Sequence, residues 1–279
     1  MSFASLGLHP DLLRTLTQRG HLQPTPIQAA TLPAALGGRD LIGAAVTGSG
    51  KTLAYVLPIL QQMLHQAPES PRPVRALVLV PARDLALQFS DTFAAYAQAL
   101  PVRIKVVTLF GGVSINPQWM ALRGGADVVV ATPGRLLDLA ARRRTHGPEA
   151  AYSGLRLDRL DTLVLDEADR LLEDGFADEL GRVLGLLPRR RRQWLFSATF
   201  GPRVLALARD LLQDPVSIGV VPSAADTSTD RLRREPPAKV GHSPAALPPV
   251  GTTQPIRPQA PDATFPLSNP NEGVRLGST

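Results

Sequence analysis

Short apolar runs alternate with segments of helical periodicity along the first 220 residues of the chain. The runs show little apolar and polar alternation, as expected of strands that are covered on both faces. The expected strands are residues 40–46, 76–80, 104–109, 127–131, 161–165, 193–197 and 216–219. Helices are expected over residues 10–17, 27–36 and 53–64. Alternating strands and helices are typical of βαβ units, so the pattern predicts an α/β fold with a mostly parallel sheet and helices on both faces.

This alternation ends near residue 221. Residues 222–279 contain eleven of the 27 prolines and show no strand or helix periodicity. Such a segment cannot bury enough apolar surface to offset the entropy that ordering would cost. The sequence therefore predicts an N-terminal segment over residues 1–38, one α/β domain over residues 39–221 and a disordered Pro-rich tail over residues 222–279.

Composition narrows the class of protein. Of the 279 residues 44% are hydrophobic, which is enough for a core. The chain has 30 Lys and Arg and 24 Asp and Glu, which gives a net charge of +6. An excess of positive charge is compatible with a polyanionic partner such as nucleic acid. Cysteine is absent, which excludes disulfides and thiolate metal sites. No apolar run has membrane-spanning length and the N-terminus does not resemble a signal peptide, so we expect a soluble cytoplasmic protein without a membrane partner.

The stretch from Ala45 to Thr52 follows the first strand and opens a helix. Gly48 and Gly50 let backbone N–H groups converge on a phosphate, and Lys51 adds a positive charge beside the helix N-terminus. The Thr52 hydroxyl is suited to Mg²⁺, so the stretch predicts a P-loop for ATP or GTP. The general P-loop pattern has glycine where Ala45 stands, and an incidental Gly/Ser loop is the alternative.

The strand over residues 161–165 ends in Asp166 and Glu167. Ligands of such sheets bind at the carboxyl ends of the strands, where the P-loop also lies. Asp166 can hold Mg²⁺, usually through water, and Glu167 can polarise an attacking water. The alternative is that both form a solvated helix start with Asp169, favoured by the helix dipole.

Other strand ends carry arginines, hydroxyls or tight glycine turns that suit backbone phosphates. They are residues 81–88, 110–112 and 132–135. An ordinary turn and helix cap is the better account of each one alone, but their placement on one sheet edge favours a phosphate contact. Ser197 and Thr199 follow the strand over residues 193–197. Gln28 lies after a proline-stiffened loop, where its amide could read an adenine edge or merely begin a helix.

Taken together, these motifs resemble the DEAD-box family of ATP-dependent RNA helicases, and among them the bacterial RhlE-like group. The motifs lie in the family's order at residues 20–28, 45–52, 81–88, 111–112, 132–135, 166–169 and 197–199. The resemblance covers residues 1–220 and implies a RecA-like domain. Ala45 is the residue that the DEAD-box P-loop prefers. His21 stands where the family usually has an aromatic residue, and Ala82 and Asp84 replace its usual Thr and Glu.

The resemblance also implies the roles of individual residues. ATP would contact Phe3, His21, Gln28, Thr47, Gly48, Ser49, Gly50, Lys51 and Thr52. Mg²⁺ would bind at Thr52 and Asp166, and the catalytic residues would be Lys51, Asp166 and Glu167. The RNA sugar-phosphate backbone would contact Arg83, Gly112, Thr132 and Arg135. Asp169, Ser197 and Thr199 would couple hydrolysis to strand separation.

Members of this family have two RecA-like domains, and hydrolysis uses arginines of the second. Nothing after residue 221 resembles that second domain. We therefore expect an RNA-helicase-family ATPase represented by its first RecA-like domain, which binds ATP, hydrolyses it poorly alone and takes a second RecA-like domain in trans. Two alternatives stay open. One is a non-catalytic ATP- or RNA-binding module that acts through a partner, and the other is a reading frame shifted near residue 221.

Overall fold

The computed structural model describes residues 2–45, 48–66, 69–145 and 155–219. For residues 143–145 it describes the backbone alone. Within these residues seven strands form one sheet in which all paired strands are parallel. They are β1 (Leu41–Ala44), β2 (Ala76–Leu79), β3 (Val106–Leu109), β4 (Val128–Ala131), β5 (Thr162–Leu165), β6 (Arg192–Ser197) and β7 (Val216–Ile218). Each strand coincides with a predicted apolar run, so the α/β prediction is confirmed. The tail predicted over residues 222–279 lies outside the described residues.

Helices connect the strands. They are η1 (Ala4–Leu6), α1 (Pro10–Gln18), α2 (Pro26–Leu36), α3 (Lys51–Met63), α4 (Arg83–Ala97), α5 (Ile115–Ala121), α6 (Pro133–Thr145), α7 (Ala168–Leu171), α8 (Ala177–Leu184) and α9 (Pro202–Leu211). The three helices predicted from periodicity are confirmed as α1, α2 and α3. None of the helices that the structure describes combines the length and apolar character needed to cross a lipid bilayer.

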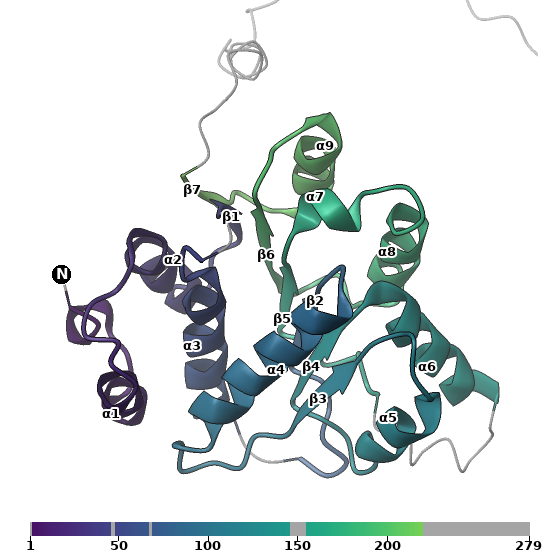
Figure 1. Ribbon diagram of the computed structural model, residues 1–279, viewed down its shortest axis with the longest axis horizontal. Helices are drawn as coiled ribbons and strands as arrows, with labels where there is room; N and C mark the ends of the chain where they lie inside the picture. The colour runs from purple at the N-terminus through teal and green to yellow at the C-terminus, as the bar shows by residue number, and fades with distance from the viewer. Residues whose placement is uncertain (1, 46–47, 67–68, 146–154, 220–279) are drawn as a thin grey trace, which may run out of the picture. The chain divides into compact units, whose positions relative to one another are not determined.

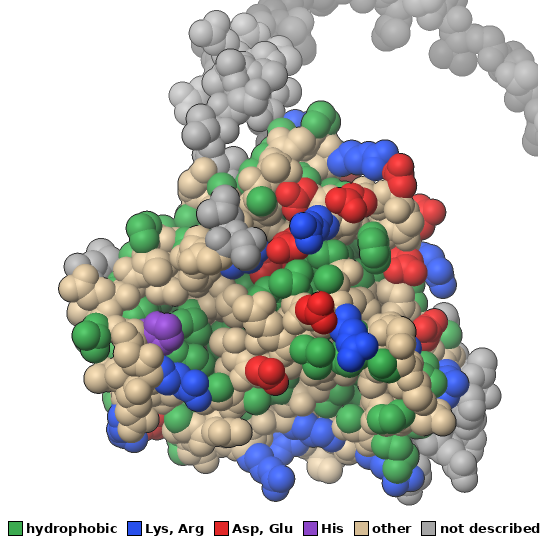
Figure 2. Space-filling model, in the orientation of Figure 1, with side chains coloured by type: hydrophobic (Ala, Val, Ile, Leu, Met, Phe, Trp, Pro, Cys, Tyr) green, Lys and Arg blue, Asp and Glu red, His purple; other side chains and the backbone are tan. Residues whose placement is uncertain are grey.

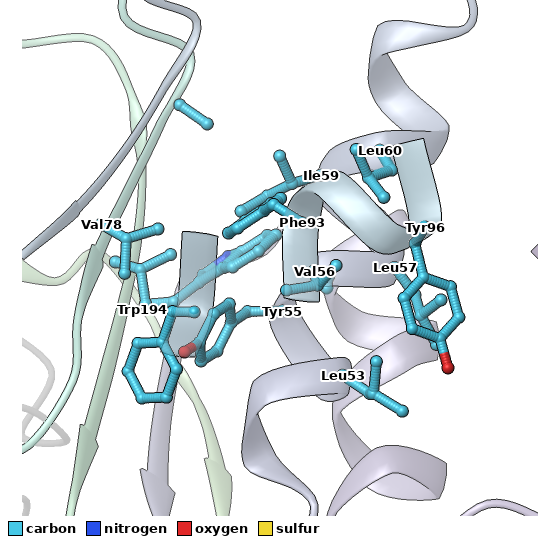
Figure 3. Close-up of a cluster of buried hydrophobic side chains, with 14 of the residues drawn as sticks. Leu53, Tyr55, Val56, Leu57, Ile59, Leu60, Val78, Phe93, Tyr96 and Trp194 are labelled. Atoms are coloured by element: carbon cyan, nitrogen blue, oxygen red, sulfur yellow. The ribbon is translucent and has the colours of Figure 1, made fainter. Parts of the chain in front are cut away.

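Two apolar clusters hold the helices to the sheet, one on each face (Figure 1). Successive residues of a strand point to opposite faces, so Val164 and Trp194 join the cluster under α1 to α4, while Leu163 and Leu195 join the cluster under α6, α8 and α9. Figure 3 shows part of the first cluster, with side chains of α3 lying among those of the sheet and of α4. Full burial of a side chain such as Val, Leu, Ile or Phe contributes about 1.5–3 kcal/mol to the free energy of folding.

The order of the strands decides which motifs meet. It is β3-β4-β2-β5-β6-β1-β7, so β5, β6 and β1 are neighbours in one half of the sheet and β3, β4 and β2 in the other. The P-loop follows β1, Asp166 follows β5 and Ser197 ends β6. The motifs that contain Arg83, Gly112 and Thr132 follow the three strands of the other half. The carboxyl edge of the sheet therefore carries two adjoining groups of polar residues.

Gly125 provides a test of the packing at the opposite edge. Its φ is +88°, and a Cβ there would lie 2.6 Å from the backbone nitrogen of Arg72 and closer still to the Arg72 carbonyl. We expect Gly125→Ala to lower the free energy of unfolding by at least about 1 kcal/mol, because backbone strain and a backbone clash coincide. Urea unfolding monitored by circular dichroism measures the change.

Gly181→Ala is the matched control. Gly181 lies inside α8 with nothing within 4 Å of the added Cβ. Alanine is the better helix former by about 0.5–1 kcal/mol, so this variant is expected to be more stable than the wild type. Equal effects of the two substitutions would contradict the account of Gly125.

Candidate active site

The P-loop lies between β1 and α3. Thr47 lies outside the described residues, so the structure gives no placement for it. Gly48 and Gly50 have φ angles of +84° and +87°, a region that favours glycine, and no atom lies within 4 Å of a Cβ built at Gly48. The buried hydroxyl of Ser49 has no hydrogen-bond partner among the described residues. The loop therefore presents an open turn and an unused hydroxyl at the N-terminus of α3, a favourable place for an anion.

Gln28, in the first turn of α2, is hydrogen-bonded to this loop. Its side chain is 3% exposed, and its amide nitrogen donates to the Gly50 carbonyl at 3.0 Å. Its amide oxygen accepts from the backbone N–H of Thr25 at 3.0 Å, in a capping box that begins α2. A Cβ on Gly50 would lie 2.6 Å from the Gln28 amide nitrogen, so the contact requires glycine. Both ends of the Gln28 amide thus join the start of α2 to the P-loop.

The other two residues expected near the adenine have different surroundings. Phe3 is 4% exposed and belongs to the apolar cluster under α1 to α4. His21 is exposed, and its backbone N–H donates to the Leu16 carbonyl at 2.9 Å. The structure therefore places Phe3 in the core and leaves the His21 side chain open to solvent.

Asp166 is the centre of a buried polar cluster. Its side chain is fully buried, and its Oδ1 lies 2.9 Å from Nζ of Lys51, the first residue of α3. The Tyr55 hydroxyl donates to Asp166 Oδ2 at 3.1 Å, and the Glu167 backbone N–H donates to Oδ1 at 2.8 Å. Lys51 Nζ also lies 3.9 Å from Glu167 Oε1. One lysine therefore faces two carboxylates at the end of β5.

Burial and charge set the protonation of this cluster. Burial raises the pKa of Asp166, although Lys51 and the hydrogen bonds from Tyr55 and the Glu167 backbone oppose the rise. Burial and then the Asp166 charge raise the pKa of Tyr55 well above its ordinary value. Tyr55 therefore stays protonated and acts as a hydrogen-bond donor. Sequence reasoning missed Tyr55, although it is four residues after Lys51 and so on the same face of α3.

Glu167 has an unusual backbone. Its φ and ψ are 55° and 51°, the left-handed region, and it is the N-cap of α7. A non-glycine residue in this region costs of order 1–3 kcal/mol and persists only where the surroundings enforce it. Its side chain approaches Lys51, and Arg170 Nη1 lies 3.4 Å from its Oε2. This backbone turn lets two consecutive carboxylates lie near the same lysine.

Asp169, Ser197 and Thr199 form a hydrogen-bonded link between α7 and the end of β6. The Thr199 hydroxyl and backbone N–H donate to Asp169 Oδ2 at 2.8 and 3.1 Å. The Asp169 backbone N–H donates to Ser197 Oγ at 3.2 Å, and the Ser197 hydroxyl donates to the Thr199 carbonyl at 2.7 Å. Burial raises the pKa of Asp169, but the hydrogen bonds from Thr199 and Ser197 outweigh it and leave the pKa below its usual range. The structure brings these three predicted residues together.

The other half of the edge carries the residues expected to contact RNA. Arg83 is exposed at the start of α4, and its guanidinium lies 5.0 Å from the centre of the Phe110 ring. Gly112 is exposed with a φ of +79°. Gln118 fixes this loop, since its amide bonds both the N–H and the carbonyl of Phe110 at 3.0 Å. Sequence reasoning missed Gln118, because a single glutamine in a short helix carries no distinguishing pattern.

Arg135 lies in the first turn of α6, and this helix begins directly after Thr132. The Thr132 backbone N–H donates to the Leu109 carbonyl at 2.9 Å, which joins the start of α6 to the end of β3. Arg135 is 8% exposed, and its Nη2 donates to the Val113 carbonyl at 2.8 Å. Its buried Nε and Nη1 have no hydrogen-bond partner among the described residues, and Asp138 is 3.7 Å from Nε. A buried guanidinium with spare donors is suited to an anion.

The donors and acceptors divide along the edge by their chemistry. The P-loop offers backbone amides, the Ser49 hydroxyl and the Lys51 ammonium beside two carboxylates, a set that suits a polyphosphate with a divalent cation. No group of three or more His, Asp or Glu side chains capable of holding a metal gathers in the described part of the chain. The other half presents arginines and turns, which suit backbone phosphates.

Comparison with known proteins shows the family of the chain. The sequence profile described as DEAD/DEAH box helicase matches residues 25–207. The chain belongs to this family. The DEAD-box motif itself, Asp166 to Asp169, lies within the match, and so do the P-loop and the Ser197 to Thr199 segment. The family resemblance predicted from the ordered motifs is thereby confirmed.

Individual DEAD-box relatives are similar over most of this chain. The ATP-dependent rRNA helicase rrp3 of Sclerotinia sclerotiorum is 43% identical over 219 residues, which cover 78% of this chain and 42% of the relative. The ATP-dependent RNA helicase DeaD of Mycobacterium tuberculosis is 42% identical over 217 residues, 78% of this chain and 36% of the relative. The chain thus spans about two fifths or less of the length of these curated relatives.

A solved DEAD box protein from the hyperthermophile Methanococcus jannaschii shares the fold. Its TM-score is 0.68 at 31% sequence identity, and the match covers 78% of this chain and 55% of that chain. The predicted RecA-like architecture of this DEAD-box domain is therefore confirmed.

Tyr55→Phe tests the support of Asp166. The substitution keeps the ring and removes the hydroxyl that donates to Asp166 Oδ2. Hydrogen bonds to charged groups are worth about 1.5–3 kcal/mol, and we expect a loss of unfolding free energy in that range. Tyr96→Phe is the control, because the buried Tyr96 hydroxyl has no hydrogen-bond partner among the described residues. Its removal should change the free energy by less than about 0.5 kcal/mol, and equal losses in thermal or urea unfolding would refute the assignment.

Thr199→Val tests the link to Asp169. The variant removes the hydroxyl donor, so the Asp169 pKa should rise toward its ordinary value of about 3.9, while Thr199→Ser should keep it low. NMR titration of the Asp169 carboxyl carbon measures both. A lowered native pKa stabilises the fold above the unfolded pKa, and the stabilisation is lost as pH falls through the native pKa. Thr199→Val should therefore lose less stability on acidification, and an unshifted pKa would contradict the network.

Proposed function

We propose that this chain is the ATP-binding and RNA-binding domain of a DEAD-box ATP-dependent RNA helicase, with ATP and Mg²⁺ bound at the P-loop. The observation that carries the proposal is the buried cluster in which Lys51 faces Asp166 and Glu167, 2.9 and 3.9 Å away, at the start of α3. The matched relatives include proteins named ATP-dependent RNA helicases. The motifs at the same edge supply the donors that RNA phosphates require.

The residues present suit a nucleoside triphosphate. Gly48, Ser49 and Gly50 offer backbone amides to phosphate oxygens, and Ser49 a hydroxyl that has no hydrogen-bond partner in the described part of the chain. We assign Thr47 to the same set. The Lys51 ammonium pairs with the β- and γ-phosphates. Mg²⁺, when bound through Thr52 and Asp166, offsets charge on the phosphates.

Glu167 holds and polarises the attacking water in this proposal. Its left-handed backbone turns its carboxylate toward Lys51, next to the phosphate loop. The Tyr55 hydroxyl keeps Asp166 Oδ2 in place. We therefore assign the catalytic roles to Lys51, Asp166 and Glu167, with Tyr55 as a positioning residue.

Adenine recognition is assigned to the segment before the P-loop. His21 is exposed and can stack on a base, although an imidazole stacks more weakly than a larger ring. Gln28 joins the start of α2 to the Gly50 carbonyl, so adenine bound at Gln28 is coupled directly to the shape of the P-loop. Phe3 supports this segment from the core.

RNA is assigned to the β3-β4-β2 half of the edge. Arg83 and Arg135 contribute charge, Gly112 an open turn and Thr132 a hydroxyl at the start of α6. The buried Nε and Nη1 of Arg135, which have no hydrogen-bond partner among the described residues, support a phosphate contact. Such contacts go to the backbone, so they bind RNA without reading its sequence. The network of Asp169, Ser197 and Thr199 lies beside the carboxylates at the end of β6, and we assign to it the coupling of hydrolysis to strand separation.

A second RecA-like domain completes the site in this proposal. The family resemblance implies that it supplies arginines to the phosphates, and the matched residues cover 42% and 36% of the two curated relatives named above. An arginine finger contributes about 10³–10⁵ in rate to phosphoryl transfer. We propose that the second domain acts in trans on this chain. The intact Lys51, Asp166 and Glu167 favour this function over a non-catalytic binding module. The cytoplasmic location stays a prediction.

The test adds a separately expressed second RecA-like domain from a matched relative to the 279-residue chain. Alone, the chain should bind a fluorescent ATP analogue and hydrolyse ATP slowly. With the second domain and RNA, the rate should rise toward the 10³-fold or more that arginine fingers supply. Lys51→Ala should lose nucleotide binding, whereas Glu167→Gln should retain binding and lose about 10²–10⁴-fold in the stimulated rate. Normal nucleotide binding with no stimulation would favour the non-catalytic alternative.

A further inference from the structure

A second polar site lies at the amino edge of the sheet, at the other end of the strands. It is a cavity of about 920 Å³ at the start of β3, walled by the end of α4 and the turn after α5. Its lining residues include Arg72, Arg103, Lys105 and Arg123, with Leu100 and Val102 among its apolar members. We call it the amino-edge pocket. In Figure 2, Lys and Arg side chains gather along the lower margin of the molecule, below the end of α4.

Positive charge dominates this pocket. None of the described residues that line it is acidic. Asp127 lies beside it and accepts from Arg72 Nη1 and from the Lys105 backbone N–H, both at 2.7 Å. The next acidic residues along this edge, Glu69 and Asp161, pair with Arg75. The described lining therefore carries four cationic side chains, and Asp127 beside it forms an ion pair with one of them, Arg72.

Neutral backbone carbonyls also hold two of these cations, Lys105 and Arg72. Lys105 Nζ donates to the Arg123 carbonyl at 2.6 Å, and Arg72 Nη1 also donates to the Arg103 carbonyl at 2.9 Å. Both contacts fix a cation with a neutral acceptor. The exposed side chains of Arg103 and Arg123 have no ion pair in the described part of the chain. Burial and the charge of Arg72 lower the pKa of Lys105, an effect that a bound anion would offset.

We propose that the amino-edge pocket binds the sugar-phosphate backbone of RNA, as a contact additional to the carboxyl edge. This inference rests on the proposed function, which makes RNA the ligand of this chain. A cavity of about 920 Å³ is far larger than a single phosphate needs, and its cations are spread around an apolar floor. None of its described lining residues is aromatic, so the contact we propose is to the backbone and is independent of sequence.

The strand β3 joins the two proposed RNA contacts, since one lies at each of its ends. β3 is the edge strand of the sheet, so no further strand separates Gly112 at one end of it from Lys105 at the other. Its four residues span about 13 Å at roughly 3.3 Å per residue. A strand of RNA that leaves the carboxyl edge can therefore follow this side of the sheet to the pocket within a few nucleotides.

The test measures RNA affinity of the 279-residue chain by fluorescence anisotropy, at several KCl concentrations, with a short and a long oligouridine. The variant Arg103→Gln with Arg123→Gln should weaken binding of the long RNA by about 5- to 30-fold. Its salt slope should fall by about 1.4, because each lost phosphate contact removes about 0.7 on single strands. Binding of the short RNA, which covers only the carboxyl edge, should be unchanged.

The matched control is Arg14→Gln with Arg182→Gln, two exposed arginines outside the pocket with the same change in net charge. The control should leave the salt slope for the long RNA intact. Equal losses in both double variants, or no loss in the pocket variant, overturn the proposal. Inorganic tripolyphosphate distinguishes a free oligophosphate from RNA as the ligand. If tripolyphosphate binding depends on Arg103 and Arg123 while the pocket variant binds the long RNA normally, the ligand is a free oligophosphate and the proposal is overturned.

A third variant separates this inference from the proposed function. Arg135→Gln should weaken both RNAs, because Arg135 belongs to the carboxyl edge. If Arg135→Gln weakens binding and the pocket variant does not, the pocket proposal falls and the proposed function stands. If the pocket variant weakens the long RNA and Arg135→Gln has no effect, the assignment of the carboxyl edge falls instead. A wild-type chain that binds neither RNA refutes both.

Discussion

The buried ion pair between Lys51 and Asp166 is the contact on which the rest of the site depends. It joins the first turn of α3 to the end of β5, and both side chains are almost entirely removed from solvent. Burying two charges costs several kcal/mol per ion unless good geometry and further hydrogen bonds compensate. Here Tyr55 and the Glu167 backbone supply those hydrogen bonds. Replacement of one partner alone would leave an uncompensated charge inside the fold.

Neighbouring contacts transmit the constraint to the other motifs. Gln28 connects the P-loop to α2, and Asp169 connects α7 to the end of β6. These contacts bond the P-loop to the segment before it and α7 to the segment after β6. Lys51 pairs with Asp166, which accepts from the Glu167 backbone N–H, and Asp169, two residues further along the chain, accepts from Thr199. Such a chain of contacts is the physical basis that coupling between nucleotide and RNA would need.

Much of this architecture follows from patterns along the chain. The inner strands were predictable because both of their faces are buried, which produces continuous apolar runs such as that of β4. Apolar runs do not specify which strands are neighbours, so the division of the edge into two halves emerged only from the structure. Tyr55 and Gln118 escaped prediction for a related reason. Their importance depends on where a side chain ends in space, next to Asp166 or the Phe110 backbone, and no local motif encodes that meeting.

The backbone of Glu167 has a consequence for how this position can evolve. Glycine would adopt its left-handed conformation without strain, and asparagine with less strain than glutamate. Selection for a stable fold and selection for a carboxylate at this point therefore act in opposite directions. The chain has glutamate at this position despite the backbone strain. A library of variants sorted only for thermostability would be drawn away from glutamate at position 167, while the sheet beneath it stayed unchanged.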